Sequence, residues 1–354
     1  MTAKPRILII GANGQLGTEL ALALAERYGE AQVVTSDQVP TGRHRHIAHE
    51  MLDVTDVGQL REVVERHGIT QIYLLAAALS ATGEKAPAWA WNLNMTGLLN
   101  VLELARQKGI EKVFWPSSIA AFGPTTPPDQ TPQHTIMEPK TVYGISKLAG
   151  EGWCRWYFEN HGVDVRSVRY PGLISYKTLP GGGTTDYAID IFHSAVKGEP
   201  YACFLDKDES LPMMYMDDAV RATIELMEAP SQRITERGSY NLAGVSFTPA
   251  EIAAAIRRQL PDFQISYAPD FRQAIAGSWP NSIDDSPARR DWGWNPAFGL
   301  GEITSDMLAN LAHLRSATDT PGHGNSFKLA ARSTSQTPAN AAISNEPPMK
   351  ISRW

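Results

Sequence analysis

Apolar residues in the first half of the chain occur in short continuous runs, separated by longer stretches in which apolar positions recur with helical spacing. The short runs predict buried β-strands at residues 6–10, 32–37, about 51–53, 71–77, 112–118 and 163–170. The longer stretches predict helices near residues 14–28, 56–67, 86–107 and 143–161. Strands that alternate with helices are typical of a parallel sheet with crossover helices. The pattern therefore predicts an α/β fold built on a doubly wound parallel sheet.

The pattern changes after residue 170, where a Gly/Thr-rich loop precedes helices predicted near 184–198, from Asp217 and after Thr248. We expect residues 1–170 to form the main domain. Residues 171–318 are expected to form mainly a smaller α/β lobe that binds the substrate, with some segments returning to the main sheet. Residues 319–354 lose apolar periodicity and are rich in Ser, Thr, Pro and Asn, which predicts a disordered C-terminal tail.

Composition narrows the classes of function. The 354 residues include 32 Lys+Arg and 38 Asp+Glu, for a net charge of −6, so no basic field favours nucleic acid or an anionic membrane. Two cysteines, Cys154 and Cys203, are too few for a disulfide framework or a four-cysteine zinc module. The N-terminal apolar run is too short for a secretory signal, and no later run reaches the length of a membrane span. We expect a cytoplasmic protein.

Metal binding is also not expected. Three histidines, His44, His46 and His49, are spaced like metal ligands, but no partner carboxylate is evident nearby. The alternation of two of them suits an exposed strand.

A glycine-rich turn follows the first predicted strand. Gly11, Gly14 and Gly17 are spaced by two residues each and lead into a helix. Such glycines permit a tight turn and let backbone N–H groups at the helix N-terminus approach a pyrophosphate, as in the Rossmann fold. Glycine-rich turns also close strand–helix units for purely structural reasons, so the turn alone is a weak signal.

Asp37 strengthens this interpretation, because it ends the second strand about twenty residues after Gly17. A carboxylate there would accept hydrogen bonds from the adenosine ribose and repel a 2′-phosphate, which predicts NAD rather than NADP. A role for Asp37 as a simple turn residue stays open. Asp53 would meet the adenine, and Asp56 is predicted to cap the next helix. Small residues end the fourth strand, although packing of a strand end explains these positions nearly as well. The predicted cofactor contacts are Gly11, Gly14, Gln15, Leu16, Gly17, Asp37, Asp53, Val54, Leu75, Ala76, Ala77, Asn94, Tyr143, Lys147 and Tyr170.

Tyr143 and Lys147 are four residues apart at the start of a predicted helix, so both side chains lie on one helix face. They follow a strand that ends in Ser117 and Ser118, at the sheet edge where open α/β folds bind ligands. Oxidation of an alcohol by a nicotinamide requires a base, and a neighbouring ammonium and a positive cofactor ring lower the pKa of a tyrosine. We therefore predict Tyr143 as the base, Lys147 as the residue that tunes it and holds the ribose, and Ser117 as the residue that positions the reacting oxygen.

These residues resemble those of the extended short-chain dehydrogenase/reductases, relatives of UDP-galactose 4-epimerase. The shared motifs are GANGQLG, Asp37, PSSIAAFGP, YGISK and RYPGLIS. Within that superfamily the second half is similar to the epimerase-like L-threonine 3-dehydrogenases, through GGGTTDYA, LPMMYMDDAVRAT, YNLAG and residues 269–294. The resemblance implies NAD-dependent oxidation of L-threonine at its hydroxyl-bearing carbon to L-2-amino-3-oxobutanoate, and a homodimer. Ser118 departs from the threonine expected in much of the family.

A small amino-acid substrate also agrees with the residues after Gly181. Free N–H groups before the next helix, with the hydroxyls of Thr184 and Thr185, would receive a carboxylate without an arginine. A glycine-rich hinge followed by a threonine N-cap is the alternative, and the two are compatible. The predicted substrate contacts are Ser80, Ser117, Ser118, Tyr143, Gly182, Thr184 and Thr185.

Two other functions stay open at this point. A nucleotide-sugar epimerase or dehydratase would need a diphosphate clamp, for which the second half offers only scattered arginines. A non-catalytic dinucleotide sensor would keep the three glycines but has no need of Ser117, Tyr143 and Lys147 together.

The predicted helix 143–161 carries Trp153, Trp156, Tyr157 and Phe158. Core packing is the first explanation for this aromatic surface. The second is a homodimer interface shared with Trp89 and Trp91 of helix 86–107.

Overall fold

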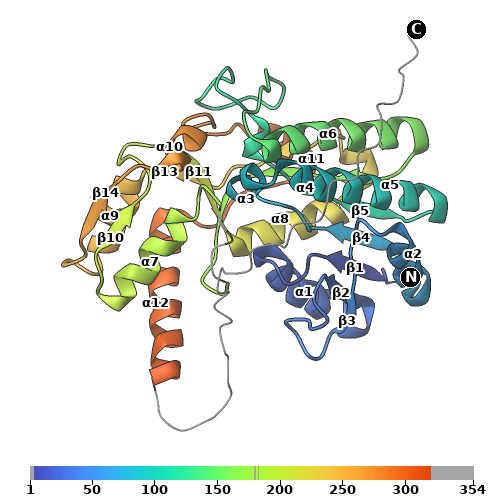
Figure 1. The fold of residues 1–354 in the computed structure, drawn as a ribbon, viewed down its shortest axis with the longest axis horizontal. Helices are drawn as coiled ribbons and strands as arrows, with labels where there is room; N and C mark the ends of the chain where they lie inside the picture. Colours follow the sequence, from blue (N-terminus) through green and yellow to red (C-terminus); the bar gives the residue numbers. More distant parts are fainter. Residues whose placement is uncertain (1–3, 179–180, 182, 320–354) are drawn as a thin grey trace, which may run out of the picture.

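A six-stranded parallel sheet forms the centre of the main domain in the computed structural model, which describes residues 4–178, 181 and 183–319 (Figure 1). The strand order is β3-β2-β1-β4-β5-β7, and every paired neighbour runs parallel. The strands are β1 Ile7–Ile10, β2 Val33–Asp37, β3 Ala48–Met51, β4 Gln71–Leu74, β5 Lys112–Phe114 and β7 Val165–Arg166. This is the strand order of a dinucleotide-binding sheet, and the predicted doubly wound α/β fold is confirmed.

Alternating side chains of the strands reach two hydrophobic cores, one on each face of the sheet. Ile7 and Ile9 of β1 pack with α1 and α8, whereas Leu8 and Ile10 pack with α2, α5 and α6. The helices of the main domain are α1 Gln15–Tyr28, α2 Val57–His67, α3 Ser80–Lys85, α4 Pro87–Trp91, α5 Gly97–Lys108, α6 Val142–His161 and α8 Met216–Glu228. Helices on both faces leave the carboxyl edge of the sheet for the site.

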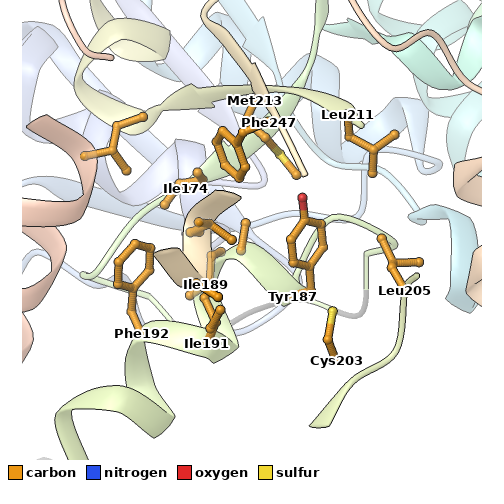
Figure 2. Packing of buried hydrophobic residues seen from close by; sticks show 14 of the residues in the cluster. Ile174, Tyr187, Ile189, Ile191, Phe192, Cys203, Leu205, Leu211, Met213 and Phe247 are labelled. Carbon is orange, nitrogen blue, oxygen red and sulfur yellow. The ribbon is translucent and has the colours of Figure 1, made fainter. Parts of the chain in front are cut away.

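The second lobe lies at the left of Figure 1, beyond the carboxyl side of the sheet. Its core brings together Tyr187, Phe192, Met213 and Phe247, from a helix and two strands (Figure 2). The strands outside the main sheet are β6 Ser117–Ser118, β8 Val168–Tyr170, β9 Gly172–Ile174, β10 Tyr201–Cys203, β11 Leu211–Tyr215, β12 Tyr240–Asn241, β13 Val245–Phe247 and β14 Ile265–Tyr267. The remaining helices are α7 Tyr187–Lys197, α9 Pro249–Arg257, α10 Phe271–Ala276, α11 Ser286–Trp292 and α12 Leu300–Asp319.

Segments after residue 170 return to the main domain. Helix α8 shares a hydrophobic core with α1, and β12 pairs with β8, which also pairs with β6. The apolar run 112–118 is therefore two strands in different sheets. The predicted helix 86–107 is also divided, into α4, a π-helical turn at Asn92–Thr96 and α5.

Three predictions concern the ends of elements or of the chain. Strand β3 ends at Met51, so Leu52 and Asp53 of the predicted strand lie beyond it. Asp56 caps α2 as predicted, because its side chain accepts from the N–H groups of Gly58 and Gln59. Helix α12 continues to Asp319, and the rest of the predicted tail, residues 320–354, lies outside the described residues. None of the helices in the described ranges is long and apolar enough to cross a membrane.

Candidate active site

The glycine-rich turn between β1 and α1 contains two glycines that the packing requires and one that it does not. Gly11 has φ +84°, and a Cβ there would lie 2.6 Å from the backbone nitrogen of Ala76. A Cβ on Gly17 would lie 2.6 Å from the carbonyl oxygen of Gly11. A Cβ on Gly14, by contrast, would make only one ordinary contact, at 3.4 Å. The missing side chain at Gly14 is therefore unexplained by packing and suits the approach of a pyrophosphate to the backbone.

Helix α1 starts directly at this turn. Its N-cap is Gly14, which has no side chain to bond the free N–H groups of the first turn, and these N–H groups favour an anion. The Nε2 atom of Gln15 is buried and has no hydrogen-bond partner among the described residues. Leu16 is partly buried beside it. A free helix terminus and an orphaned amide fit the phosphates of a dinucleotide.

Asp37 ends β2 next to the turn, as predicted. Its Oδ2 accepts from the N–H of Asn13 at 3.1 Å, and Oδ1 accepts from the N–H of Gln38 at 2.8 Å. The carboxamide of Asn13 then holds the following loop, because Nδ2 donates to the Thr41 carbonyl at 3.0 Å and Oδ1 accepts from the Arg43 N–H at 3.1 Å. A pocket opens beside the carboxylate, lined by Asn13, Gly14, Asp37, Val39, Thr41, Gly42 and Arg43. The pocket and its carboxylate fit the adenosine end of NAD.

Asp53 and Val54 lie after β3, close to α2. The Oδ1 atom of Asp53 accepts from the Oγ1 of Thr55 at 2.7 Å and from its N–H at 2.9 Å, and the side-chain bond contributes most to lowering the pKa of Asp53. Val54 is buried, and its Cγ1 would lie 2.8 Å from a Cβ on Gly97. One carboxylate oxygen of Asp53 is therefore committed to a local turn.

Leu75, Ala76 and Ala77 follow β4 and are partly buried. The N–H groups of Leu75 and Ala76 both donate to the carbonyl of Ile10, which holds this strand end against the glycine-rich turn. The structure thus brings the ends of β1, β2 and β4 to one edge, as the predicted cofactor site requires.

Two predicted cofactor contacts use their polar side chains elsewhere. The Oδ1 of Asn94 accepts from the N–H of Ala78 at 2.8 Å, and its Nδ2 donates to the Oγ of Ser146 at 3.0 Å. The hydroxyl of Tyr170 bonds to the Oγ1 of Thr223 on α8. These bonds brace neighbouring elements, and the cofactor contacts of Asn94 and Tyr170 stay predictions.

Tyr143 and Lys147 lie one turn apart on α6, whose N-cap Thr141 accepts from the N–H of Gly144 at 3.0 Å. The Nζ of Lys147 lies 5.4 Å from the ring centroid of Tyr143 and donates to the carbonyl of Pro116 at 2.6 Å. Burial lowers the pKa of Lys147 to about 7. Burial also raises the pKa of Tyr143 to about 12, against the opposing effect of a hydrogen bond with Ser118. The pair therefore places a phenol with a raised pKa beside an amine with a lowered pKa.

The serine beside Tyr143 is Ser118 and not Ser117. Both belong to β6, and successive side chains of a strand point to opposite faces. Ser117 is buried and donates to the Oε1 of Glu151 at 2.6 Å, away from Tyr143. The Oγ of Ser118 accepts from the N–H of Ala120 at 3.2 Å, which leaves its own proton free to donate. The prediction that Ser117 positions the reacting oxygen is therefore corrected by one residue.

The predicted substrate residues come together in part. Ser80, at the start of α3, and Thr184 are both buried, and their hydroxyl oxygens lie 3.4 Å apart although 104 positions separate them in the sequence. A Cβ on Gly172 would lie 2.7 Å from the Cβ of Thr185. Gly182 lies outside the described residues. The N-cap of α7 is Asp186, so the predicted threonine N-cap is wrong.

Sequence reasoning missed a buried ion pair under the site. Arg169 on β8 binds Glu151 with Nε at 2.9 Å and Nη2 at 2.8 Å, and donates to the Oδ1 of Asn241 at 2.8 Å. Glu151 is four residues after Lys147 on the same face of α6, a spacing that could have indicated it.

A second missed contact joins the cofactor helix to the loop before the second lobe. Glu19 is buried on α1, accepts from Ser175 and pairs with the Nζ of Lys177 at 2.8 Å.

The described residues contain no group of three or more His, Cys, Asp or Glu side chains that could hold a metal ion. His44 and His49 instead bond to neighbouring backbone and threonine oxygens.

Comparison with known proteins extends over most of the chain. Residues 7–243 match the sequence model of the NAD dependent epimerase/dehydratase family. The mitochondrial L-threonine 3-dehydrogenase of Sus scrofa is 46% identical over 86% of this chain and 82% of its own length. An uncharacterized epimerase/dehydratase of Staphylococcus saprophyticus is 47% identical over 86% of this chain and 96% of its own length.

Solved structures agree with this match. The holo form of a GalE-like L-threonine dehydrogenase from Cupriavidus necator is 77% identical, with a TM-score of 0.86, over 87% of this chain and all of that one. The L-threonine dehydrogenase of Clostridium difficile is 44% identical, also with a TM-score of 0.86, over 88% of this chain and 98% of that one. A UDP-glucose 4-epimerase of Thermotoga maritima, 22% identical with a TM-score of 0.76, shares the fold. With this similarity and a turn that fits the cofactor, the chain belongs to the NAD dependent epimerase/dehydratase family and is an NAD-dependent oxidoreductase.

Proposed function

We propose that this enzyme oxidises L-threonine at its 3-hydroxyl to L-2-amino-3-oxobutanoate, the first step of threonine breakdown towards glycine or aminoacetone. The observation that carries the proposal is the 77% identity to the Cupriavidus necator L-threonine dehydrogenase, which covers both the main domain and the second lobe. The arrangement of Ser118, Tyr143 and Lys147 supports the same reaction, because these residues and the glycine-rich turn follow the carboxyl ends of parallel strands of one sheet.

The cofactor fits the turn at Gly11–Gly17 and Asp37 and supplies the hydride acceptor. Tyr143 is positioned to take the hydroxyl proton, for which its phenol must first ionise. The pKa of about 12 without ligand is too high for that task, and the ammonium of Lys147 favours the phenolate. Lys147 therefore acts by its charge, and burial makes that charge sensitive to pH.

Ser118 supplies the hydrogen bond that orients the reacting oxygen. Its oxygen accepts from the N–H of Ala120, and that bond leaves the hydroxyl proton available to donate. In the proposed substrate site, Ser80 and Thr184 offer two buried hydroxyls for the threonine carboxylate. This arrangement needs no arginine.

Turnover with defined substrates tests the proposal. The purified enzyme is mixed with NAD and L-threonine, L-serine, 3-hydroxybutyrate or UDP-galactose. NADH formation is followed for each, and UDP-glucose is also measured in the UDP-galactose reaction, because epimerisation returns the hydride and forms no net NADH. We expect NADH to form with L-threonine. L-Serine should give NADH far more slowly or not at all. Turnover of UDP-galactose without turnover of threonine would replace the proposal with nucleotide-sugar chemistry.

The role of Tyr143 has its own test. Tyr143→Phe keeps the ring but removes the proton acceptor, so we expect kcat to fall by at least about 10²-fold while NAD affinity changes little. Turnover and calorimetric NAD titration measure the two effects. Tyr28→Phe, at the far end of α1, is the control and should retain full turnover. Near-normal activity of Tyr143→Phe would contradict its assignment as the base.

Location and assembly are part of the proposal. We place the enzyme in the cytoplasm on the sequence grounds given above, and we expect a homodimer. One L-threonine 3-dehydrogenase of 47% identity is described as monomeric, so the assembly needs its own measurement.

A further inference from the structure

An indole ring lies directly under the buried ammonium of Lys147. Trp115 follows β5 and is 4% exposed, and the Nζ of Lys147 is 4.5 Å from its ring centroid. This distance is within the range of a cation–π interaction, which is strongest over tryptophan and in desolvated sites. The sequence prediction of the site gave Trp115 no role.

Helix α6 carries a glycine where this indole needs space. A Cβ on Gly150 would lie 2.4 Å from the Cη2 atom of Trp115 and 2.6 Å from its Cζ2 atom. Glycine inside a helix costs about 1 kcal/mol relative to alanine, so its presence calls for a packing reason. Gly152, two residues later, would place its Cβ in open space. Of these two glycines, only Gly150 is required by the indole.

Few other groups stabilise the ammonium. Lys147 donates to the carbonyl of Pro116, and it forms no ion pair in the part of the chain that the structure describes. The titratable groups facing it are Tyr143, Glu151 and Cys154, all on its own helix. The charge of Glu151 is largely committed to Arg169 on β8. The indole face is therefore a principal attraction for the charge in a buried site.

We propose that Trp115 is a positioning residue that keeps Lys147 protonated and fixed beneath Tyr143, in a slot that Gly150 provides. The proposal rests on the proposed function, because it assumes that the charge of Lys147 acts on Tyr143 during oxidation.

The charge of Lys147 in each protonation state determines which limb of the pH–rate profile depends on Trp115. With cofactor bound, the positive nicotinamide ring and the ammonium would lower the Tyr143 pKa below that of Lys147. Protonation of the phenolate would then leave Lys147 charged before and after, so the indole would have little influence on the acid limb of the pH–rate profile. Loss of the Lys147 proton removes the cation that the indole attracts, so the alkaline limb reports on Trp115. Removing the indole should move the alkaline limb to lower pH.

Two kinds of variant test this prediction. Trp115→Leu removes the aromatic face and Trp115→Phe keeps a weaker one, while Gly150→Ala pushes the indole from its slot. We expect the Lys147 pKa to fall by about one unit in Trp115→Leu and by less in Trp115→Phe. Gly150→Ala should shift it in the same direction. The pKa is read in the cofactor-free protein by NMR of ¹⁵N-labelled lysine side chains, with Lys147→Met to identify the signal.

The matched controls are Gly152→Ala on the same helix and Trp294→Leu in the other core. Neither should move the Lys147 pKa, although Trp294→Leu loses a buried indole and with it stability. If Trp115→Leu does not fold, the Lys147 pKa in Trp115→Phe and in Gly150→Ala provides the test. An unchanged Lys147 pKa in the folded variants overturns the proposal.

The NMR titration uses no substrate, so its outcome is independent of whether threonine is oxidised. In the active enzyme, the alkaline limb of kcat should shift by the same amount and the acid limb should stay in place. An NMR shift without threonine turnover in the wild type would reject the proposed function and leave the role of Trp115 standing.

Discussion

At the scale of single residues, two adjacent serines on β6 have different tasks. Ser117 lies in the buried network of Glu151 and Arg169, whereas Ser118 bonds with Tyr143. Spacing in the sequence identified the pair of hydroxyls but could not choose between them. The choice depends on which face of a two-residue strand points to the site, and this is fixed by pairing of β6 with β8.

Alanine substitutions separate the two serines. Ser118→Ala removes the donor to the reacting oxygen, so we expect kcat to fall by about 10²-fold with little change in melting temperature. Ser117→Ala leaves a buried carboxylate one hydrogen bond short, which should cost about 1–3 kcal/mol of stability and spare most turnover. Kinetics and thermal unfolding of both variants measure the difference. Loss of turnover in Ser117→Ala at unchanged stability would restore Ser117 as the positioning residue.

At the scale of elements, periodicity predicted β1, β2, α1, α2 and α6 to within one or two residues, whereas the predicted strand 71–77 runs three residues past the end of β4. The apolar pattern of each of the well-predicted elements is uninterrupted, and glycine, aspartate or threonine marks an end of each element. The prediction of one strand over 112–118 overlooked Pro116, which cannot donate to a strand ladder and lies between β5 and β6. The π-helical turn before α5 was also beyond prediction, since one extra residue per turn leaves no mark in a 3.6-residue pattern.

The end of β2 determines cofactor choice in our proposal. Asp37→Ser removes the negative charge that repels a 2′-phosphate, while Arg43 remains in the same pocket. We expect kcat/KM to fall by roughly tenfold for NAD and to rise for NADP. Asp56→Ala is the control, because it removes only the cap of α2 and should cost about 1 kcal/mol without altering preference. An unchanged NAD/NADP ratio in Asp37→Ser would refute the role of Asp37.

At the scale of the whole molecule, α4 and α6 lie beside each other (Figure 1). Both helices carry tryptophans that are exposed to solvent. The exposed fractions are 51% for Trp89, 44% for Trp91, 39% for Trp153 and 43% for Trp156. Core packing therefore explains Tyr157, which is 7% exposed, but not these four tryptophans. Adjacent exposed indoles favour an interface with a second copy of the chain.

Solution mass tests the homodimer. Trp156→Glu introduces a charge into the aromatic surface, so we expect it to shift the enzyme from dimer to monomer in analytical ultracentrifugation. Phe271→Glu is the control, because Phe271 is 60% exposed on α10 in the second lobe and should leave the mass unchanged. A wild-type enzyme that sediments as a monomer at micromolar concentration would contradict the proposed assembly.

The carboxamide of Asn13 fastens the loop at residues 41–43 with two hydrogen bonds within the protein itself. Ordering one backbone residue costs about 1–2 kcal/mol of conformational entropy, and here folding has already met that cost. Adenosine would then enter a rigid pocket, and its binding free energy would not be reduced by the entropy of closing a loop. The adenosine end of the site is thus preorganised for its ligand.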